Sequence, residues 1–157
     1  MSATSPHTSI VESGLRYVME RSVQARAANV QVPPELDLMD PQLAEQAIGH
    51  YAVVCAPCHG APGSPSAPWM QLYPPAPDLT AAAAVEAWTD QELFWIIKHG
   101  IKDTGMVAVP PGHSDDDVWA LTAVVRQLPR MTPARYQALR DDHRASPVGS
   151  GRTHTGH

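Results

Sequence analysis

The sequence is 157 residues long, has a net charge of −5 and contains only 6% aromatic residues. This length suits one domain with tails, and the 16 prolines and 10 glycines indicate that much of the chain is loop. The acidic balance and the lack of a basic run exclude nucleic acid as a partner. No stretch of the sequence is apolar over the length of a membrane span.

Residues 8–30 form the first segment with a helical period of apolar residues. Val11, Leu15 and Val18 fall on one face of a helix, and the charged residues lie largely off that face. The pattern predicts a helix that ends before Pro33. Two roles stay open for this helix: packing on the rest of the chain, or serving as a stalk or docking element for a partner.

A second helix is predicted from Asp40 onward, with Asp40 as its N-cap and Pro41 in its first turn. Apolar residues then recur at three- and four-residue steps up to residue 55. Gly49 lowers the helix propensity in the middle of this segment, so we expect another helix to cross closely there.

The only two cysteines of the chain lie at the end of this second helix, in the sequence Cys55-Ala56-Pro57-Cys58-His59. C-x-x-C-H is the attachment signature of c-type haem. Two thiols about one helical turn apart can add to the vinyl groups on one edge of a porphyrin, and the next residue can bind the iron. The motif therefore predicts one covalently attached haem c with His59 as its proximal ligand.

Three other interpretations of the two cysteines are weaker. A thioredoxin-type pair requires a preceding strand in an α/β frame, whereas the residues before Cys55 are predicted to be helical. A zinc site would need a second pair of ligands at a fixed spacing, but the remaining histidines are scattered. A disulfide between residues so close in sequence would stabilise the fold little.

The prolines between residues 60 and 87 exclude long regular structure, so this segment is predicted to be mostly loop. It also carries large apolar side chains, which we expect to cover the His59 side of the haem. These are Trp69, Met70, Leu72, Tyr73 and Leu79. A backbone carbonyl of this loop, at Pro74 or Pro77, is expected to accept the proton of the second His59 ring nitrogen, because such bonds orient a metal ligand.

A third helix is predicted from the capping box of Thr89 and Glu92 to Gly100. His99 lies in its last turn, where a cationic side chain is favoured by the helix dipole. We expect His99 to be structural or to face solvent rather than to bind a metal.

The loop after Gly100 contains Met106, which follows Gly105 and belongs to no helical or strand pattern. A thioether bound as the sixth ligand stabilises reduced iron. Met106 is therefore our candidate for the far side of the haem. Its competitors are Met70, Met131 and, if the ligation were bis-histidine, His113.

Ser114 and the three acids that follow it predict the start of a last core helix, which Pro129 closes. Thr132 and Pro133 can start one more short helix through Leu139. From residue 141 onward the chain is polar and is expected to be disordered. Whether the histidines of this tail bind a metal stays open; they include His154 and His157.

In this order the elements resemble the class I c-type cytochromes over about residues 40–130. The matching features are a helix that ends in C-x-x-C-H-G, a Pro-rich loop, a short helix, a Gly-Met loop and a C-terminal helix. In this sequence they lie at residues 55–60, 74–79, 88–100, 105–106 and 119–128. The resemblance implies that the first and last core helices cross near Gly49. It also implies that Cys55 and Cys58 bind the haem, with His59 and Met106 as axial ligands.

Residues 6–34 are similar to the stretch after a membrane anchor in some bacterial cytochromes of this group. Haem of the c type is attached outside the cytoplasm, yet no signal peptide is recognisable at the start of the sequence. We therefore expect a targeting or anchoring segment upstream of Ser2. The expected location is the periplasm or the outer face of the cytoplasmic membrane.

The predicted fold class is all-α: a class I cytochrome c fold in which three to four core helices and a Pro-rich loop wrap the haem, plus an extra N-terminal helix. We expect three parts. Residues 1–39 form the N-terminal helix and linker, residues 40–130 the haem domain, and residues 131–157 a short helix and tail.

The predicted function is electron transfer by a mono-haem cytochrome c that is not an enzyme and cycles between Fe(III) and Fe(II). Its expected partners are redox proteins, namely a dehydrogenase donor and an oxidase or other acceptor; the mildly acidic surface is compatible with docking on a basic patch. One alternative is a cytochrome subunit of a larger dehydrogenase or oxidase. Another is a haem enzyme or sensor with an open distal site, which a methionine at the sixth position disfavours.

Overall fold

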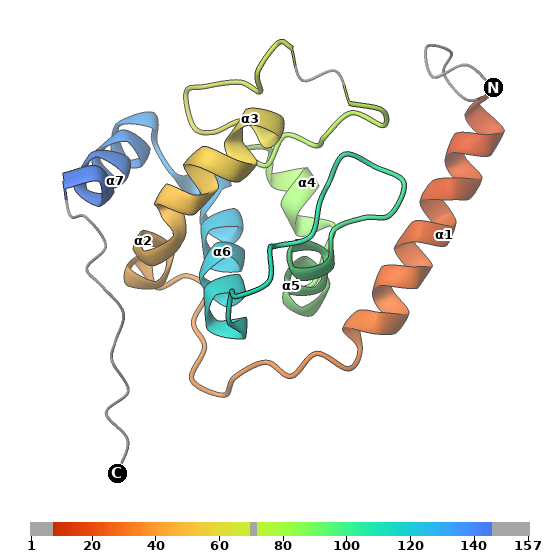
Figure 1. Cartoon of the computed structure of the whole chain (residues 1–157), viewed down its shortest axis with the longest axis horizontal. Helices are drawn as coiled ribbons and strands as arrows, with labels where there is room; N and C mark the ends of the chain where they lie inside the picture. Colours follow the sequence, from red (N-terminus) through yellow and green to blue (C-terminus); the bar gives the residue numbers. More distant parts are fainter. Residues whose placement is uncertain (1–7, 70–71, 146–157) are drawn as a thin grey trace.

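The computed structural model describes residues 8–69 and 72–145, and within these ranges the chain is helical, with no strand (Figure 1). The helices in chain order are α1 (Ser9–Ala27), α2 (Pro41–His50), the π-helical segment η1 (Tyr51–Cys55), α3 (Ala56–His59), α4 (Ala82–Glu86), α5 (Asp90–His99), α6 (Asp115–Gln127), the 3₁₀ turn η2 (Leu128–Arg130) and α7 (Pro133–Ala145). The predicted all-α class is confirmed.

Helix α6 forms the centre of the fold and packs most extensively against α2. It begins with the expected capping box of Ser114 and Asp117. Every residue of α6 from Val118 to Val125 is buried, so the helix is covered on all sides. Small residues on α2, Ala44 and Ala47, are buried at this contact and let the two helices approach closely.

The side chain closest to Gly49 comes from helix α7. We expected the last core helix, α6, to cross near this glycine. The atoms nearest to a Cβ added at Gly49 all belong to His143 of α7. Buried Tyr136 and Leu139 also lie on α7, which packs against α2. The imidazole of His143 therefore occupies the space that a side chain at this position would take.

The expectation of disorder from residue 141 onward is wrong up to Ala145, because α7 continues to that residue. Its exposed acids face solvent while His143 packs on Gly49, so a polar composition did not exclude a docked helix. His154 and His157 lie outside the described residues.

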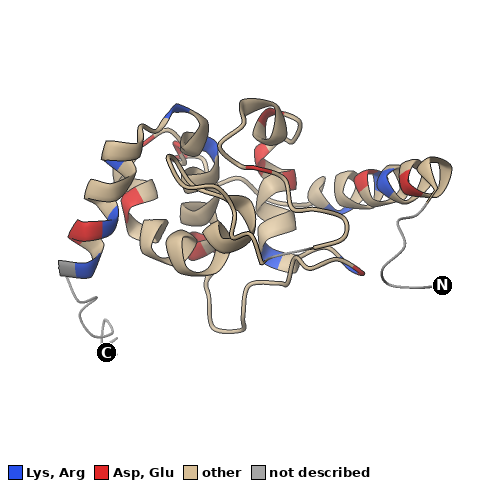
Figure 2. Cartoon of the chain, turned by 90° about the horizontal axis from the view of Figure 1, so that it is seen from above, with Lys and Arg blue, Asp and Glu red and all other residues tan. Residues whose placement is uncertain are grey.

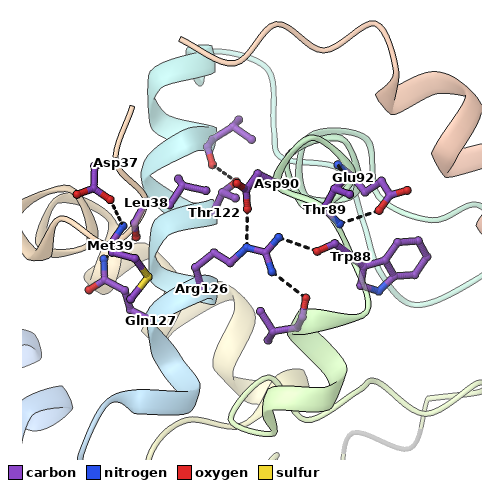
Figure 3. Close-up of polar contacts among 12 residues, drawn as sticks. Asp37, Leu38, Met39, Trp88, Thr89, Asp90, Glu92, Thr122, Arg126 and Gln127 are labelled. Atoms are coloured by element: carbon purple, nitrogen blue, oxygen red, sulfur yellow. Dashed lines mark hydrogen bonds and ion pairs between the residues drawn. The ribbon is translucent and has the colours of Figure 1, made fainter. Parts of the chain in front are cut away.

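Arg126 near the end of α6 connects α4 and α5 to the centre of the fold (Figure 3). Its guanidinium donates to the carbonyl oxygens of Val85 at 3.0 Å and Trp88 at 2.6 Å, and it pairs with Asp90 at 2.6 Å. Helix α4 was not predicted, since residues 60–87 were expected to be mostly loop. The Arg126 contacts give the ends of α4 and the start of α5 a fixed position on α6.

Helix α1 packs on the molecule only near its C-terminal end, where buried Val23 and Ala27 lie and where it contacts α5. Its N-terminal part extends away from the other helices (Figure 2). The expected apolar face is largely in solvent there: Leu15 is 57% and Val18 64% exposed. Both roles predicted for this helix thus have support, each at a different end. None of the helices in the described part of the chain is long and apolar enough to cross a membrane.

Candidate functional site

The two cysteines and His59 lie on one continuous helical stretch made of α2, η1 and α3. The N–H of Ala56 donates to the carbonyl of Tyr51, five residues earlier, which is the π-helical hydrogen bond. Such segments are rare and often occur at functional sites. Here the π segment leads directly into the C-x-x-C-H motif, beginning four residues before Cys55 and ending on it.

The turn after His59 is fixed by Tyr51 and Gly60. Tyr51 is fully buried and its hydroxyl donates to the Gly60 carbonyl at 2.7 Å. Gly60 has φ of 72°, a conformation that L side chains rarely adopt. The chain can therefore leave the helix immediately after the histidine, and the Pro-rich loop turns back over it.

The imidazole of His59 is oriented by this loop. Its Nδ1 atom lies 2.9 Å from the carbonyl oxygen of Pro77, one of the two carbonyls expected for this role. The backbone supports the same arrangement, since Leu79 N–H donates to the His59 carbonyl at 3.1 Å. A carbonyl can only accept, so Nδ1 carries the proton and Nε2 keeps the lone pair with which a neutral histidine binds a metal.

Cys55 and Cys58 are half-buried free thiols. Burial, followed by the nearby Cys58, raises the pKa of the Cys55 thiol to about 11. A thioredoxin-type nucleophile requires a lowered pKa, so this environment does not suit redox exchange between thiols. Among the described residues, no three or more His, Cys, Asp or Glu side chains form a cluster that could hold a metal ion.

Met106 lies half-buried in the loop between α5 and α6, which is folded back onto the end of α5. Ile101 N–H donates to the Met106 carbonyl at 3.0 Å, and Met106 N–H donates to the Thr104 hydroxyl at 3.1 Å. Gly100 ends α5 with φ of 66° as predicted, and the Met106 backbone lies directly against it. The position of Met106 is thus set by hydrogen bonds on both of its peptide groups.

The Pro-rich loop and the Met106 loop lie against each other (Figure 1). A Cβ on Gly105 would be 2.6 Å from Cδ2 of Leu72, so the leucine packs on the glycine next to Met106. The loop that orients His59 therefore also contacts the loop that carries the candidate sixth ligand.

The competitors of Met106 differ in position. Met131 lines a surface depression together with Pro41, the first residue of α2. The helical stretch that begins at Pro41 ends at His59, roughly 25 Å away at about 1.5 Å per residue. Met131 therefore lies near the opposite end of this stretch from His59. His113 packs its ring against His50, with centroids 4.9 Å apart, and its Nδ1 atom lies 3.1 Å from the Pro110 carbonyl. Met70 lies outside the described residues.

The side chains at this site fit a covalently attached haem. They provide two free thiols separated by two residues, an imidazole whose Nδ1 is already engaged, and a half-buried thioether on a loop that contacts the histidine's loop. His99, by contrast, is exposed and stacks on Trp95 at 4.8 Å, as expected of a residue without a ligand role.

Comparison with known protein families agrees with this chemistry. The family described as "Cytochrome C oxidase, cbb3-type, subunit III" matches residues 42–124, more than half of the chain. The chain belongs to this family. It is an electron-transfer cytochrome, and a cytochrome c domain carries covalently bound haem c. No curated protein and no solved structure matches the chain.

The family match begins in α2 and ends in α6, so it contains the C-x-x-C-H motif and Met106 and leaves out α1 and α7. Within this cytochrome domain, sequence reasoning missed the π segment η1 and the role of Tyr51. A tyrosine four residues before the first cysteine looks like an ordinary core residue. Only the folded chain brings its hydroxyl to Gly60.

Proposed function

We propose that this cytochrome transfers single electrons between redox proteins and binds its one haem through Cys55 and Cys58, with His59 and Met106 as axial ligands. The observation that carries this proposal is the 2.9 Å contact between His59 Nδ1 and the Pro77 carbonyl. It gives the histidine of the C-x-x-C-H motif the tautomer and the orientation of a metal ligand.

Bound haem supplies one-electron Fe(III)/Fe(II) chemistry. The protein holds the ligands in place: Pro77 fixes the imidazole, and the hydrogen bonds of Ile101 and Thr104 fix the Met106 backbone. Thioether ligation favours reduced iron and raises the reduction potential. A filled sixth position leaves no site for a substrate, so we propose that the protein is not an enzyme.

Spectroscopy of the periplasmically matured protein tests this assignment. The pyridine haemochrome assay is expected to report haem c in the wild type and none in Cys55→Ala/Cys58→Ala. The weak long-wavelength band of methionine-ligated Fe(III) is expected in the wild type, in Met131→Leu and in Met70→Leu, and is expected to be lost in Met106→Ala. A band that survives in Met106→Ala would show that another residue is the sixth ligand.

The alternative of an open distal site makes the opposite prediction. An enzyme or sensor would bind carbon monoxide rapidly in the reduced state, because no protein ligand would have to leave first. We expect slow, limited binding in the wild type and rapid binding in Met106→Ala. Rapid binding by the wild type would favour the enzyme or sensor.

A second candidate function, as the cytochrome subunit of an oxidase complex, is favoured by the exposed apolar face of α1 and by the family description. In this proposal residues 1–39 form the N-terminal helix and its linker, and the helix α1 docks on a neighbouring subunit. Residues 40–130 form the haem domain, and residues 131–157 form a C-terminal extension. The protein then works outside the cytoplasm, in the periplasm or on the membrane surface.

Size-exclusion chromatography with the oxidase subunits encoded beside the gene tests this candidate. Leu15→Glu in the exposed part of α1 is expected to abolish co-elution while haem content stays unchanged. Val32→Glu, a change of the same charge in the exposed linker after α1, serves as the control. Equal co-elution of both variants would exclude α1 as the docking element.

A further inference from the structure

The segments that carry and cover the haem motif contain almost no charge. Residues 51–77 include no Asp, Glu, Lys or Arg, and neither do residues 104–114. The chain as a whole has 11 basic and 16 acidic residues. Figure 2 shows most of the charged residues on the helices, while the two long loops are almost entirely uncharged.

These uncharged segments form one continuous surface. Ala67 N–H donates to the Pro57 carbonyl at 2.8 Å, which joins the Pro-rich loop to α3. Leu72 packs on Gly105, which joins the same loop to the Met106 loop. The surface made of η1, α3 and the two loops is called the uncharged face below.

The uncharged face exposes a large apolar side chain from each of its parts. Val53 on η1 is 76% exposed, Trp69 in the Pro-rich loop 79%, and Val107 next to Met106 74%. Haem binding will cover part of this area. The C-x-x-C-H motif lies within residues 51–77 and the proposed sixth ligand Met106 within residues 104–114, and neither segment contains a charged residue.

The charged residues that border the uncharged face in the sequence are Asp78, Lys102 with Asp103, and the acids Asp115–Asp117 at the start of α6, of which Asp115 pairs with Lys98. The Asp78 carboxylate accepts from the Thr80 backbone at 2.8 Å and from the Thr80 hydroxyl at 2.7 Å. Lys102 and Asp103 are adjacent residues of opposite sign at the start of the Met106 loop. The net charge of −5 thus lies outside residues 51–77 and 104–114, and part of it lies at the border of the uncharged face.

We infer that this cytochrome docks its redox partner through the uncharged face, and that the partner is a redox protein whose own docking surface is apolar and uncharged. The inference rests on the proposed haem ligands, because electrons must leave near the haem edge. The overall acidic charge is compatible with a basic partner surface. On the uncharged face, however, the charges of such a partner would be desolvated without meeting any opposite charge.

The physical consequence is an association that depends only weakly on salt. Charge-steered proteins associate fast at low salt and slow down as salt is added, whereas uncharged docking proceeds at about 10⁵–10⁶ M⁻¹s⁻¹ regardless of salt. Two copies of this chain that met through their charged surfaces would repel each other because of their net charge. Adding salt would then increase their rate of association strongly.

Electron self-exchange between reduced and oxidised holoprotein measures this directly, with a second copy of the chain as the probe. In this reaction one copy is oxidised as the other is reduced, so no further reactant is needed. The rate of exchange is measured from NMR line broadening. Raising NaCl from about 0.01 M to about 1 M shortens the Debye length from about 30 Å to about 3 Å. We expect the wild-type rate to rise only weakly over this range, because the charges that repel lie outside the uncharged face.

Variants locate the surface that is used. Trp69→Glu places a like charge on both partners within the uncharged face, so self-exchange is expected to slow at least about tenfold at low salt and to recover at high salt. Ala138→Glu adds the same charge on α7, where Ala138 is exposed, and is expected to behave as the wild type. Val53→Glu repeats the test if Trp69→Glu does not load haem.

Three results would overturn the inference. They are a wild-type rate that rises steeply with salt, a Trp69→Glu or Val53→Glu rate as insensitive to salt as the wild type, and a doubled mass in sedimentation, which would indicate a permanent dimer. The haemochrome assay and the methionine–iron band are recorded first for every variant. A failure of the haem assignment is thereby distinguished from a failure of the docking surface.

Discussion

Gly100 and Met106 lie so close together that a Cβ atom on Gly100 would be 2.5 Å from the Met106 carbonyl oxygen and 2.7 Å from the amide nitrogen of Ala108. The close approach is between two stretches of backbone, so it cannot be relieved by rotating a side chain. Gly100 also has φ of 66°. The end of α5 and the loop of the proposed sixth ligand are therefore built against each other.

Gly100→Ala is expected to push the Met106 loop away from α5. It adds backbone strain of about 1–3 kcal/mol and a steric overlap with the loop. We expect a lower urea midpoint and a weakened or lost methionine–iron band in the oxidised spectrum.

Gly112→Ala is the matched control for this change. Gly112 has φ of 107°, so alanine is strained there as well, but no atom lies within 4 Å of the added Cβ. We expect this variant to lose some stability and to keep the methionine–iron band. Loss of the band in both variants would attribute the effect to strain alone and not to the Met106 contact.

Elements with strong local signals were predicted from the sequence. The capping boxes of Thr89 with Glu92 and of Ser114 with Asp117 form as expected, because each consists of hydrogen bonds within four residues. The Asp40 cap of α2 also forms, accepting from the backbone N–H of Gln42. Such caps depend little on the rest of the chain and can be recognised without knowing the fold.

Features set by distant contacts were not predicted. Helix α4 is held by Arg126 of α6, which lies 41 residues further along the chain than Val85. This is a non-local contact, and the local sequence does not predict it. The length of α7 depends on His143 meeting Gly49. At the candidate site, the motif identified His59, but choosing Pro77 over Pro74 as its partner required the folded Pro-rich loop.

Arg126 is expected to contribute more to stability than an exposed arginine that also forms an ion pair. Arg126→Lys keeps the positive charge but cannot reach Asp90 and the carbonyls of Val85 and Trp88 together. We expect a loss of about 1.5–3 kcal/mol in the free energy of unfolding, the usual range for hydrogen bonds to a charged group. Urea denaturation of the holoprotein measures it.

Arg135→Lys is the comparison for Arg126→Lys. Arg135 pairs with Glu45 at 2.5 Å, but both side chains are more than 40% exposed. Such surface pairs contribute about 0–1 kcal/mol. If the two substitutions destabilised the protein equally, the three contacts of Arg126 would not be a structural anchor for α4 and α5.

Tyr51→Phe is expected to loosen the turn that follows His59. The substitution keeps the buried ring but leaves the Gly60 carbonyl without the hydroxyl that donates to it at 2.7 Å. An unpaired buried polar group costs about 1–3 kcal/mol, and urea denaturation is expected to show a loss of this size. Tyr17→Phe, on the exposed part of α1, is expected to change stability by less than about 0.5 kcal/mol. A Tyr51→Phe protein as stable as Tyr17→Phe would mean that water replaces the hydroxyl.

The stability of the protein is expected to fall as the pH drops below neutrality, because His50 is partly buried and lies beside His113. Burial, followed by the charge of His113, lowers the pKa of His50 below its ordinary value of 6.5, and Asp117 opposes the shift. A histidine with a lowered folded-state pKa takes up its proton more readily in the unfolded chain. Its contribution to stability is therefore complete above about pH 6.5 and is lost as the pH falls through the folded-state pKa.

Urea midpoints between about pH 8 and about pH 5 test this relationship. His50→Gln is expected to reduce the loss of stability over this range, because the substituted side chain does not titrate. His99→Gln removes a second histidine whose pKa is lowered, first by the slight burial of its largely exposed ring and then by the charge of Lys98. It is expected to reduce the loss independently, since His99 lies on α5 beside Trp95. The effects of two separate sites should add in the double variant. If His50→Gln showed the same pH dependence as the wild type, the pairing of the two imidazoles would not control the acid sensitivity of the fold.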